Sequence, residues 1–135
     1  MGAIVVSAPV AKSLKPGDHG TTFGGSPLAT RIGLELFSRI SNPEFLKHVL
    51  DMGLVFEERS KGLPHVIQSR GKGLLRGIQL APTIDLSNFT SKCLSEGLLV
   101  VSAGSQTIRL IPPLVITEDQ VNQGMDIIEK VLASY

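Results

Sequence analysis

The sequence predicts an α+β fold in which helices pack on one face of a small sheet. Apolar residues recur at helical spacing in four segments, and two short extended runs flank a glycine-rich turn at residues 71–73. A second pair of extended runs follows, the later one centred on Arg109 and closed by Pro112. The predicted order is therefore helix, helix, hairpin, helix, strand, strand, helix.

The first 25 residues predict a buried strand followed by a long loop. The apolar run at residues 3–7 is typical of a buried strand, and the glycine-rich residues 12–25 indicate a loop. Ser26 can cap a helix and Pro27 suits its first position, so we expect the first helix to begin there. Apolar side chains continue at helical spacing until residue 41.

A second helix is predicted directly after the first. Asn42 and Pro43 repeat the combination of cap and proline, and the helix is expected to close at residues 61–64. Residues 66–70 and 74–80 then predict an antiparallel hairpin. The glycines at its turn miss the G-x-G-x-x-G spacing of nucleotide-binding loops and do not open a helix, so we interpret them as hairpin glycines.

The last third predicts two helices separated by a strand pair. A helix over residues 85–96 is expected to end at Gly97, and strands are expected at residues 98–101 and around Arg109. This pairing would place Arg109 on a rigid element. Thr117 and Gln120 have the spacing of a capping box at the start of the final helix.

The composition excludes several classes of function. The chain has 135 residues and a formal net charge of +1, and no block of lysine or arginine indicates nucleic-acid or membrane-surface binding. The single cysteine, Cys93, excludes an internal disulfide and is interpreted as a small apolar side chain on a helix face. The three histidines lack partners at ligand spacing, so no metal site is expected. We see no secretory signal or membrane span.

The run from His19 to Ala29 is the first candidate binding site. Its glycines free backbone N–H groups, and Thr21 and Thr22 add hydroxyls just before the start of a helix. These donors and the helix N-terminus can all point at one oxyanion, such as a phosphate. The alternative is ordinary turn chemistry before a helix.

Arg109 is the second candidate, because it stands alone in the apolar run from Thr107 to Ile116. A buried guanidinium is costly unless a carboxylate pairs with it. Its planar fork can bind a carboxylate through two parallel hydrogen bonds, a geometry that lysine cannot reproduce. A partly exposed arginine on an edge strand and an internal salt bridge are the alternatives.

Together, HGTTFGGSPLA and IRLIPPLVI resemble the subgroup III aminotransferases, which use pyridoxal 5'-phosphate (PLP), and among them most closely the acetylornithine aminotransferases. The resemblance covers essentially the whole chain. It implies that Thr22, with Thr21 beside it, binds the PLP phosphate of the neighbouring subunit of a homodimer. It also implies that Arg109 binds the substrate α-carboxylate. Ser26 stands where the family commonly has asparagine, so any hydrogen bond that the asparagine makes in the family does not carry over to this chain.

The resemblance also predicts how the chain is divided. Residues 1–25 would be the end of the large PLP-binding α/β domain of a fold-type-I transferase, residues 26–41 a connecting helix, and residues 42–135 the carboxyl-terminal small domain. Met1-Gly2-Ala3 looks like the end of the G-x-P-x-G-A turn that follows the Schiff-base lysine. We therefore expect that catalytic lysine to lie upstream of this sequence, and the chain alone to be inactive.

The function implied by the resemblance is ping-pong transamination, with N-acetylornithine as donor and 2-oxoglutarate as acceptor, in arginine biosynthesis. Ornithine or another ω-amino donor remains open. Two further alternatives also remain open. The chain could be a truncated product that catalyses no reaction and pairs with intact subunits, or it could be a stand-alone phosphate-binding domain. The resemblance further implies a soluble protein, mitochondrial in a eukaryote or cytoplasmic in a bacterium.

Overall fold

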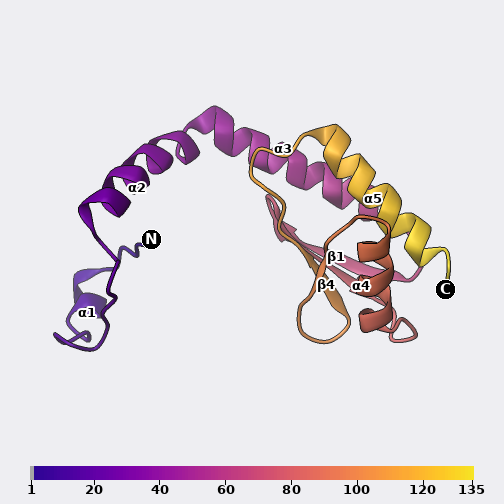
Figure 1. Ribbon diagram of the computed structural model, residues 1–135, viewed down its shortest axis with the longest axis horizontal. Coiled ribbons are helices and arrows are strands. Elements are labelled where there is room, and N and C mark those ends of the chain that lie inside the picture. The colour runs from indigo at the N-terminus through magenta and orange to yellow at the C-terminus, as the bar shows by residue number, and fades with distance from the viewer. Residues whose placement is uncertain (1) are drawn as a thin grey trace. The chain divides into compact units, whose positions relative to one another are not determined.

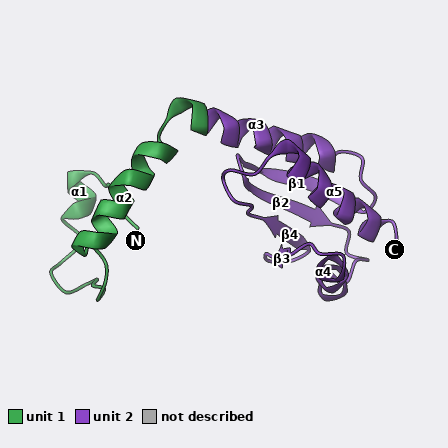
Figure 2. Cartoon of the chain, turned by 45° about the horizontal axis from the view of Figure 1, so that its top comes forward, with its two compact units in different colours: residues 1–45 green, residues 46–135 purple. Residues whose placement is uncertain are grey.

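The computed structural model describes residues 2–135, and the chain divides into two compact units, residues 1–45 and residues 46–135 (Figure 2). Met1, which we matched to the end of the family's glycine-proline turn, lies outside the described residues. No helix in residues 2–135 is both long and apolar enough to cross a membrane.

The first unit contains the helices α1 (Ala8–Ala11) and α2 (Pro27–Ile40). The prediction of a helix after Ser26 is confirmed, because the Ser26 hydroxyl accepts a hydrogen bond from the Ala29 N–H at 3.4 Å. Its apolar side chains are not covered within this unit, where residues 2–45 include no buried residue.

The predicted buried strand at residues 3–7 is wrong. Residues 3–6 are exposed and unpaired, and Ser7 instead stands at the N-cap position of α1. A strand needs a neighbouring strand to satisfy its backbone N–H and C=O groups. Since residues 2–45 contain no strand for it to pair with, the apolar run has no sheet to join.

Helix α3 (Pro43–Ser60) begins where the sequence predicted. The Asn42 side-chain carbonyl accepts hydrogen bonds from the backbone N–H groups of Glu44 and Phe45 at 2.8 and 3.3 Å. Farther along, a Cβ added at Gly53 would collide with the backbone of Gly73 in the hairpin turn. Glycine at position 53 therefore lets the turn approach the helix closely.

The second unit holds one antiparallel sheet (Figure 1), and its strand order is β1-β2-β4-β3 (Figure 2). Its strands are β1 (Val66–Lys72), β2 (Leu75–Leu80), β3 (Val101–Ser102) and β4 (Thr107–Leu110). Strands β1 and β2 form the predicted hairpin. Strand β4 pairs with β3 as predicted and also with β2, so it is an internal strand.

The strand predicted at residues 98–101 is mostly wrong, because β3 begins only at Val101. The preceding helix, α4 (Leu86–Ser95), is capped at its N-terminus by Asp85, and the residues that follow it cap its carboxyl end. The Leu98 N–H donates to the Cys93 carbonyl at 2.8 Å, and Gly97 adopts a positive φ of 89°. Residue 98 therefore completes the helix cap and is not free to join the sheet.

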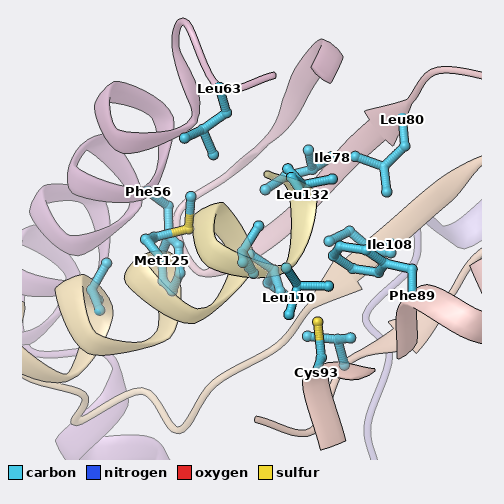
Figure 3. Close-up of a cluster of buried hydrophobic side chains, with 14 of the residues drawn as sticks. Phe56, Leu63, Ile78, Leu80, Phe89, Cys93, Ile108, Leu110, Met125 and Leu132 are labelled. Carbon is cyan, nitrogen blue, oxygen red and sulfur yellow. The ribbon is translucent and has the colours of Figure 1, made fainter. Parts of the chain in front are cut away.

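The core lies between the sheet and three helices, as the sequence predicted. Helices α3, α4 and α5 (Glu118–Leu132) all contribute buried side chains to one cluster with the sheet (Figure 3). The predicted capping box at Thr117 is present. The core residues labelled in Figure 3 are Phe56, Leu63, Ile78, Leu80, Phe89, Cys93, Ile108, Leu110, Met125 and Leu132.

Candidate functional site

Arg109 lies on the sheet face that points away from this core. On β4 its neighbours Ile108 and Leu110 are buried in the core, whereas Arg109 itself is exposed. Successive side chains of a strand alternate between the two faces of a sheet. The arginine is therefore held on a rigid internal strand with its guanidinium directed to the open face.

This placement overturns the expectation that Arg109 is buried. It also excludes the two alternatives, an arginine on an edge strand and an internal salt bridge. Arg109 is not buried, because no element of residues 46–135 covers its face of the sheet. It is not an edge-strand arginine, since β4 has a neighbour on each side. No carboxylate of the described residues forms a salt bridge with it either. The guanidinium is thus available to an external anion.

A pocket of about 370 Å³ opens beside Arg109 and is strongly cationic. Arg70, Lys72, Arg76 and Arg109 contribute to its lining, and no acidic residue does. Several positive charges around one concave surface raise the local potential and attract anions. The geometry therefore favours a small anionic ligand in this pocket.

Arg76 belongs to the wall of the pocket and already has a partner. Its side chain is 4% exposed, and its Nη2 atom donates to the Glu57 carboxylate at 3.0 Å. The Nη1 atom donates to the Gly71 carbonyl at 3.2 Å, whereas the buried Nε atom has no protein acceptor. We interpret this ion pair as a link between α3 and the hairpin, because both partners are engaged within the fold.

The glycine-rich turn with Thr21 and Thr22 lies in the first unit, just before α2. Both threonines are exposed, and neither hydroxyl forms a hydrogen bond with another residue of the described chain. A Cβ at Gly24 would collide with the Thr21 methyl group, and Gly25 has a positive φ of 76°. The two glycines therefore shape a turn that presents free hydroxyls and backbone N–H groups, which are donors suited to an oxyanion.

Cys93 lies in the core, fully buried as the sequence predicted. Burial raises the pKa of its thiol from 9.0 to about 11. The sulfur is therefore protonated at neutral pH and acts as a packing group.

Of the four basic residues that line the pocket, the sequence pointed only to Arg109, and Arg70, Lys72 and Arg76 were missed. Arg70 ends the first predicted strand of the hairpin, and it lies in register with Gly77. Gly77 in turn lies opposite Arg109. The hairpin register could have revealed the first pairing, but the second depends on long-range pairing between β2 and β4, for which the sequence carries no signal.

The fold is a small α+β unit with a four-stranded antiparallel sheet, and comparison with known proteins specifies the family. The family model for class-III aminotransferases matches residues 1–132. The chain belongs to the class-III aminotransferase family.

Similar proteins agree with this family. The chain is 42% identical to the mitochondrial acetylornithine aminotransferase of Eremothecium gossypii, over 98% of this chain and 32% of that protein. It is 39% identical to the corresponding protein of Debaryomyces hansenii, over 96% of this chain and 29% of that protein. The chain thus spans about a third of the length of these relatives.

Solved structures give the same result for the fold. The ornithine aminotransferase from Plasmodium yoelii matches with a TM-score of 0.77 and 32% identity, over 93% of this chain and 34% of that one. The acetylornithine aminotransferase from Elizabethkingia anophelis matches with a TM-score of 0.76 and 32% identity, over 93% of this chain and 33% of that one. The resemblance to the aminotransferase family is therefore confirmed in sequence and in fold.

Proposed function

We propose that this chain is the carboxyl-terminal part of a PLP-dependent aminotransferase that transfers an amino group from N-acetylornithine to 2-oxoglutarate. The observation that carries the proposal is Arg109, an unpaired guanidinium on an internal strand in a cationic pocket. The names of the similar proteins from Eremothecium gossypii and Debaryomyces hansenii support N-acetylornithine as donor. The reaction would belong to arginine biosynthesis.

In this proposal Arg109 binds the α-carboxylate that donor and acceptor have in common. Its planar fork can donate two parallel hydrogen bonds to the two carboxylate oxygens. Because β4 is paired on both sides, the side chain starts from a fixed backbone, and little ordering is needed when the substrate binds. A contact to this carboxylate does not distinguish one amino donor from another.

The turn at residues 19–25 fits the phosphate of PLP. Free hydroxyls on Thr21 and Thr22, and backbone N–H groups beside Gly24 and Gly25, can donate to phosphate oxygens. We assign Thr22, with Thr21 beside it, to the cofactor of the neighbouring subunit in a homodimer. Bound PLP would supply an electron sink that stabilises negative charge at the substrate carbon that bears the transferred amino group.

The catalytic lysine is proposed to lie outside these 135 residues. We also propose that residues 1–25 belong to the large domain, residues 26–41 to a connecting helix and residues 42–135 to the small domain. To test the lysine assignment, PLP is added to the isolated chain, followed by borohydride reduction and intact-mass measurement. The expected result is no covalent pyridoxyl group, and a single specific adduct would contradict the assignment.

Ornithine is the second candidate donor, favoured by the match to the Plasmodium yoelii ornithine aminotransferase. A truncated chain that only pairs with intact subunits is the second candidate role. Turnover of N-acetylornithine and of ornithine by the PLP-loaded protein that contains this chain distinguishes the donors. We propose a mitochondrial location in a eukaryote, as the relatives from Eremothecium gossypii and Debaryomyces hansenii are named, and a cytoplasmic one in a bacterium.

Arg109→Gln tests the carboxylate assignment. We expect it to raise KM for both substrates, with a loss of transition-state stabilisation on the order of 2–5 kcal/mol, typical of a broken charge pair. Arg59→Gln is the matched control, because Arg59 pairs with Asp126 and does not line the pocket. If KM for both substrates stays at the parent value in Arg109→Gln, the carboxylate binds elsewhere.

A further inference from the structure

The side chain of Arg70 extends from the edge strand β1 to β4, the strand that carries Arg109. Its Nη2 atom donates to the Thr107 hydroxyl on β4 at 3.2 Å. Its Nη1 atom donates to the side-chain carbonyls of Gln79 at 3.2 Å and Gln68 at 3.3 Å. Thr107 precedes Arg109 by two residues and therefore points to the same side of the sheet. The two guanidiniums thus share one face.

Gly77 is the residue that allows this crossing. It lies between Arg70 and Arg109 in a row of paired residues that spans β1, β2 and β4. A Cβ at position 77 would lie 3.3 Å from the Thr107 methyl carbon and 3.9 Å from the Arg70 Cγ. Any larger side chain would fill the space that the Arg70 side chain crosses. The glycine keeps the space between the two arginines open.

The arginines of the second unit differ in whether a carboxylate neutralises them. Arg59 pairs with Asp126, and Arg76 pairs with Glu57. The three acceptors of Arg70 are all neutral, and no salt bridge within residues 2–135 involves Arg70 or Arg109. Hydrogen bonds to neutral groups hold a guanidinium in place without cancelling its charge. Arg70 and Arg109 are therefore two positioned positive charges that no carboxylate of the described chain neutralises, and Lys72 lines the same pocket.

We propose that Arg70 is a second cation of the substrate-carboxylate site, a positioning residue that acts together with Arg109. The inference rests on the proposed function. Arg109 binds the carboxylate directly. Arg70 adds a positive potential to the pocket and fixes Thr107 beside the arginine that binds. Because two like charges repel each other in the empty pocket, a bound anion relieves that repulsion as well as pairing with Arg109.

The test separates the effect of the Arg70 charge from the effect of its planar shape. It is made in the PLP-loaded protein that contains this chain. Arg70→Gln removes the charge, Arg70→Lys keeps it but loses the planar fork, and Arg59→Gln is the control outside the pocket. We expect Arg70→Gln to raise KM for both substrates by about threefold to tenfold, with kcat within about twofold. Arg70→Lys should recover most of the loss, and Arg59→Gln should match the parent.

A second measurement follows the ionic-strength dependence of KM. Added salt screens the attraction between an exposed cation and its ligand, so KM should rise with salt less steeply in Arg70→Gln than in the parent. Parent values of KM and of its salt dependence in Arg70→Gln would overturn the inference. Equal damage by Arg70→Lys and Arg70→Gln would overturn it too, because only the hydrogen bonds to β4 would then matter.

Calorimetric titration with 2-oxoglutarate tests the same inference without turnover. Arg70→Gln should weaken binding by about threefold to tenfold, and unchanged affinity would contradict the role of Arg70. Arg109→Gln, measured in parallel, separates the two proposals. If Arg109→Gln weakens binding and Arg70→Gln does not, only the role of Arg70 fails. If the parent binds 2-oxoglutarate but transfers no amino group, the proposed function fails and the Arg70 comparison still stands.

Discussion

The two units of this chain obey the same local rules but differ in what their helices pack against. In the first unit, α2 has a serine cap and a proline start, yet Phe37 remains 65% exposed. In the second unit, α4 has an aspartate cap, and Phe89 is fully buried. Caps and periodicity therefore determine where a helix forms, whereas burial depends on the presence of the surface that the helix covers.

The two candidate sites differ in the same way, by whether the surrounding side chains are packed. Arg109 is held by a sheet whose strands and core all come from residues 46–135. Thr21 and Thr22 lie in a turn whose neighbouring apolar residues have no cover within residues 2–45. The arginine should therefore be positioned by this chain alone, whereas the threonine turn should need additional protein surface to hold its geometry.

The largest expected difference between the units concerns their phenylalanines. Phe89→Ala should lower the free energy of unfolding by about 3–5 kcal/mol, because it removes a fully buried aromatic side chain from the core. Phe37→Ala should change it by no more than about 0.5 kcal/mol, as expected for an exposed site. Urea unfolding of the chain checks both values. Equal losses would show that α2 is packed against a surface after all.

Cys93 provides a test of the core at alkaline pH. Its thiol has a raised pKa of about 11 in the folded chain, compared with 9.0 for an exposed thiol. The folded state keeps the proton between these pH values while the unfolded state releases it, so stability should fall as the pH rises through this window.

The expected loss is about 2–3 kcal/mol, from a shift of about two pKa units at roughly 1.4 kcal/mol each. Unfolding free energies of the parent and of Cys93→Ala, measured at pH 8 and above, give the contribution of the thiol as a difference. We expect the variant to be less sensitive to alkaline pH than the parent. Parallel pH profiles would contradict the buried, protonated state of Cys93.

The helix caps should give the smallest difference. The Asp85 carboxylate accepts hydrogen bonds from the N–H groups of Ser87 and Asn88 at 2.9 and 3.2 Å. Asp85→Ala should therefore cost about 1 kcal/mol of global stability, since α4 belongs to the core. Ser26→Ala should fray α2 without changing the global transition, which amide exchange can resolve. A shift of the urea midpoint by Ser26→Ala would show that the units unfold together.

Local signals in the sequence predicted most of the fold. Each cap at Ser26, Asn42 and Thr117 acts through hydrogen bonds to residues two or three positions away, so the sequence alone can show it. The hairpin was predicted for the same reason, because its two strands are joined by a short glycine turn.

Most of the errors arose where a segment depends on distant partners. The apolar residues 3–7 resemble a buried strand, but whether they form one depends on a neighbouring strand that the local pattern does not contain. The strand predicted from residue 98 fails for a local reason instead, because the Leu98 N–H donates to the Cys93 carbonyl at the end of α4. For the site, Arg109 was identified from its apolar surroundings, whereas Arg70 was missed because only the pairing of β2 with β4 brings the two together.

The division of roles between the two units is tested most directly by measuring PLP affinity and substrate KM in the same pair of variants. Thr22→Ala should weaken PLP binding by about 1–3 kcal/mol through loss of a charge-assisted hydrogen bond, and leave KM nearly unchanged at saturating PLP. Arg109→Gln should raise KM for both substrates and leave PLP affinity unchanged. The reverse pattern, or parent values for both variants, would contradict the assignment of the phosphate to the threonine turn and of the carboxylate to β4.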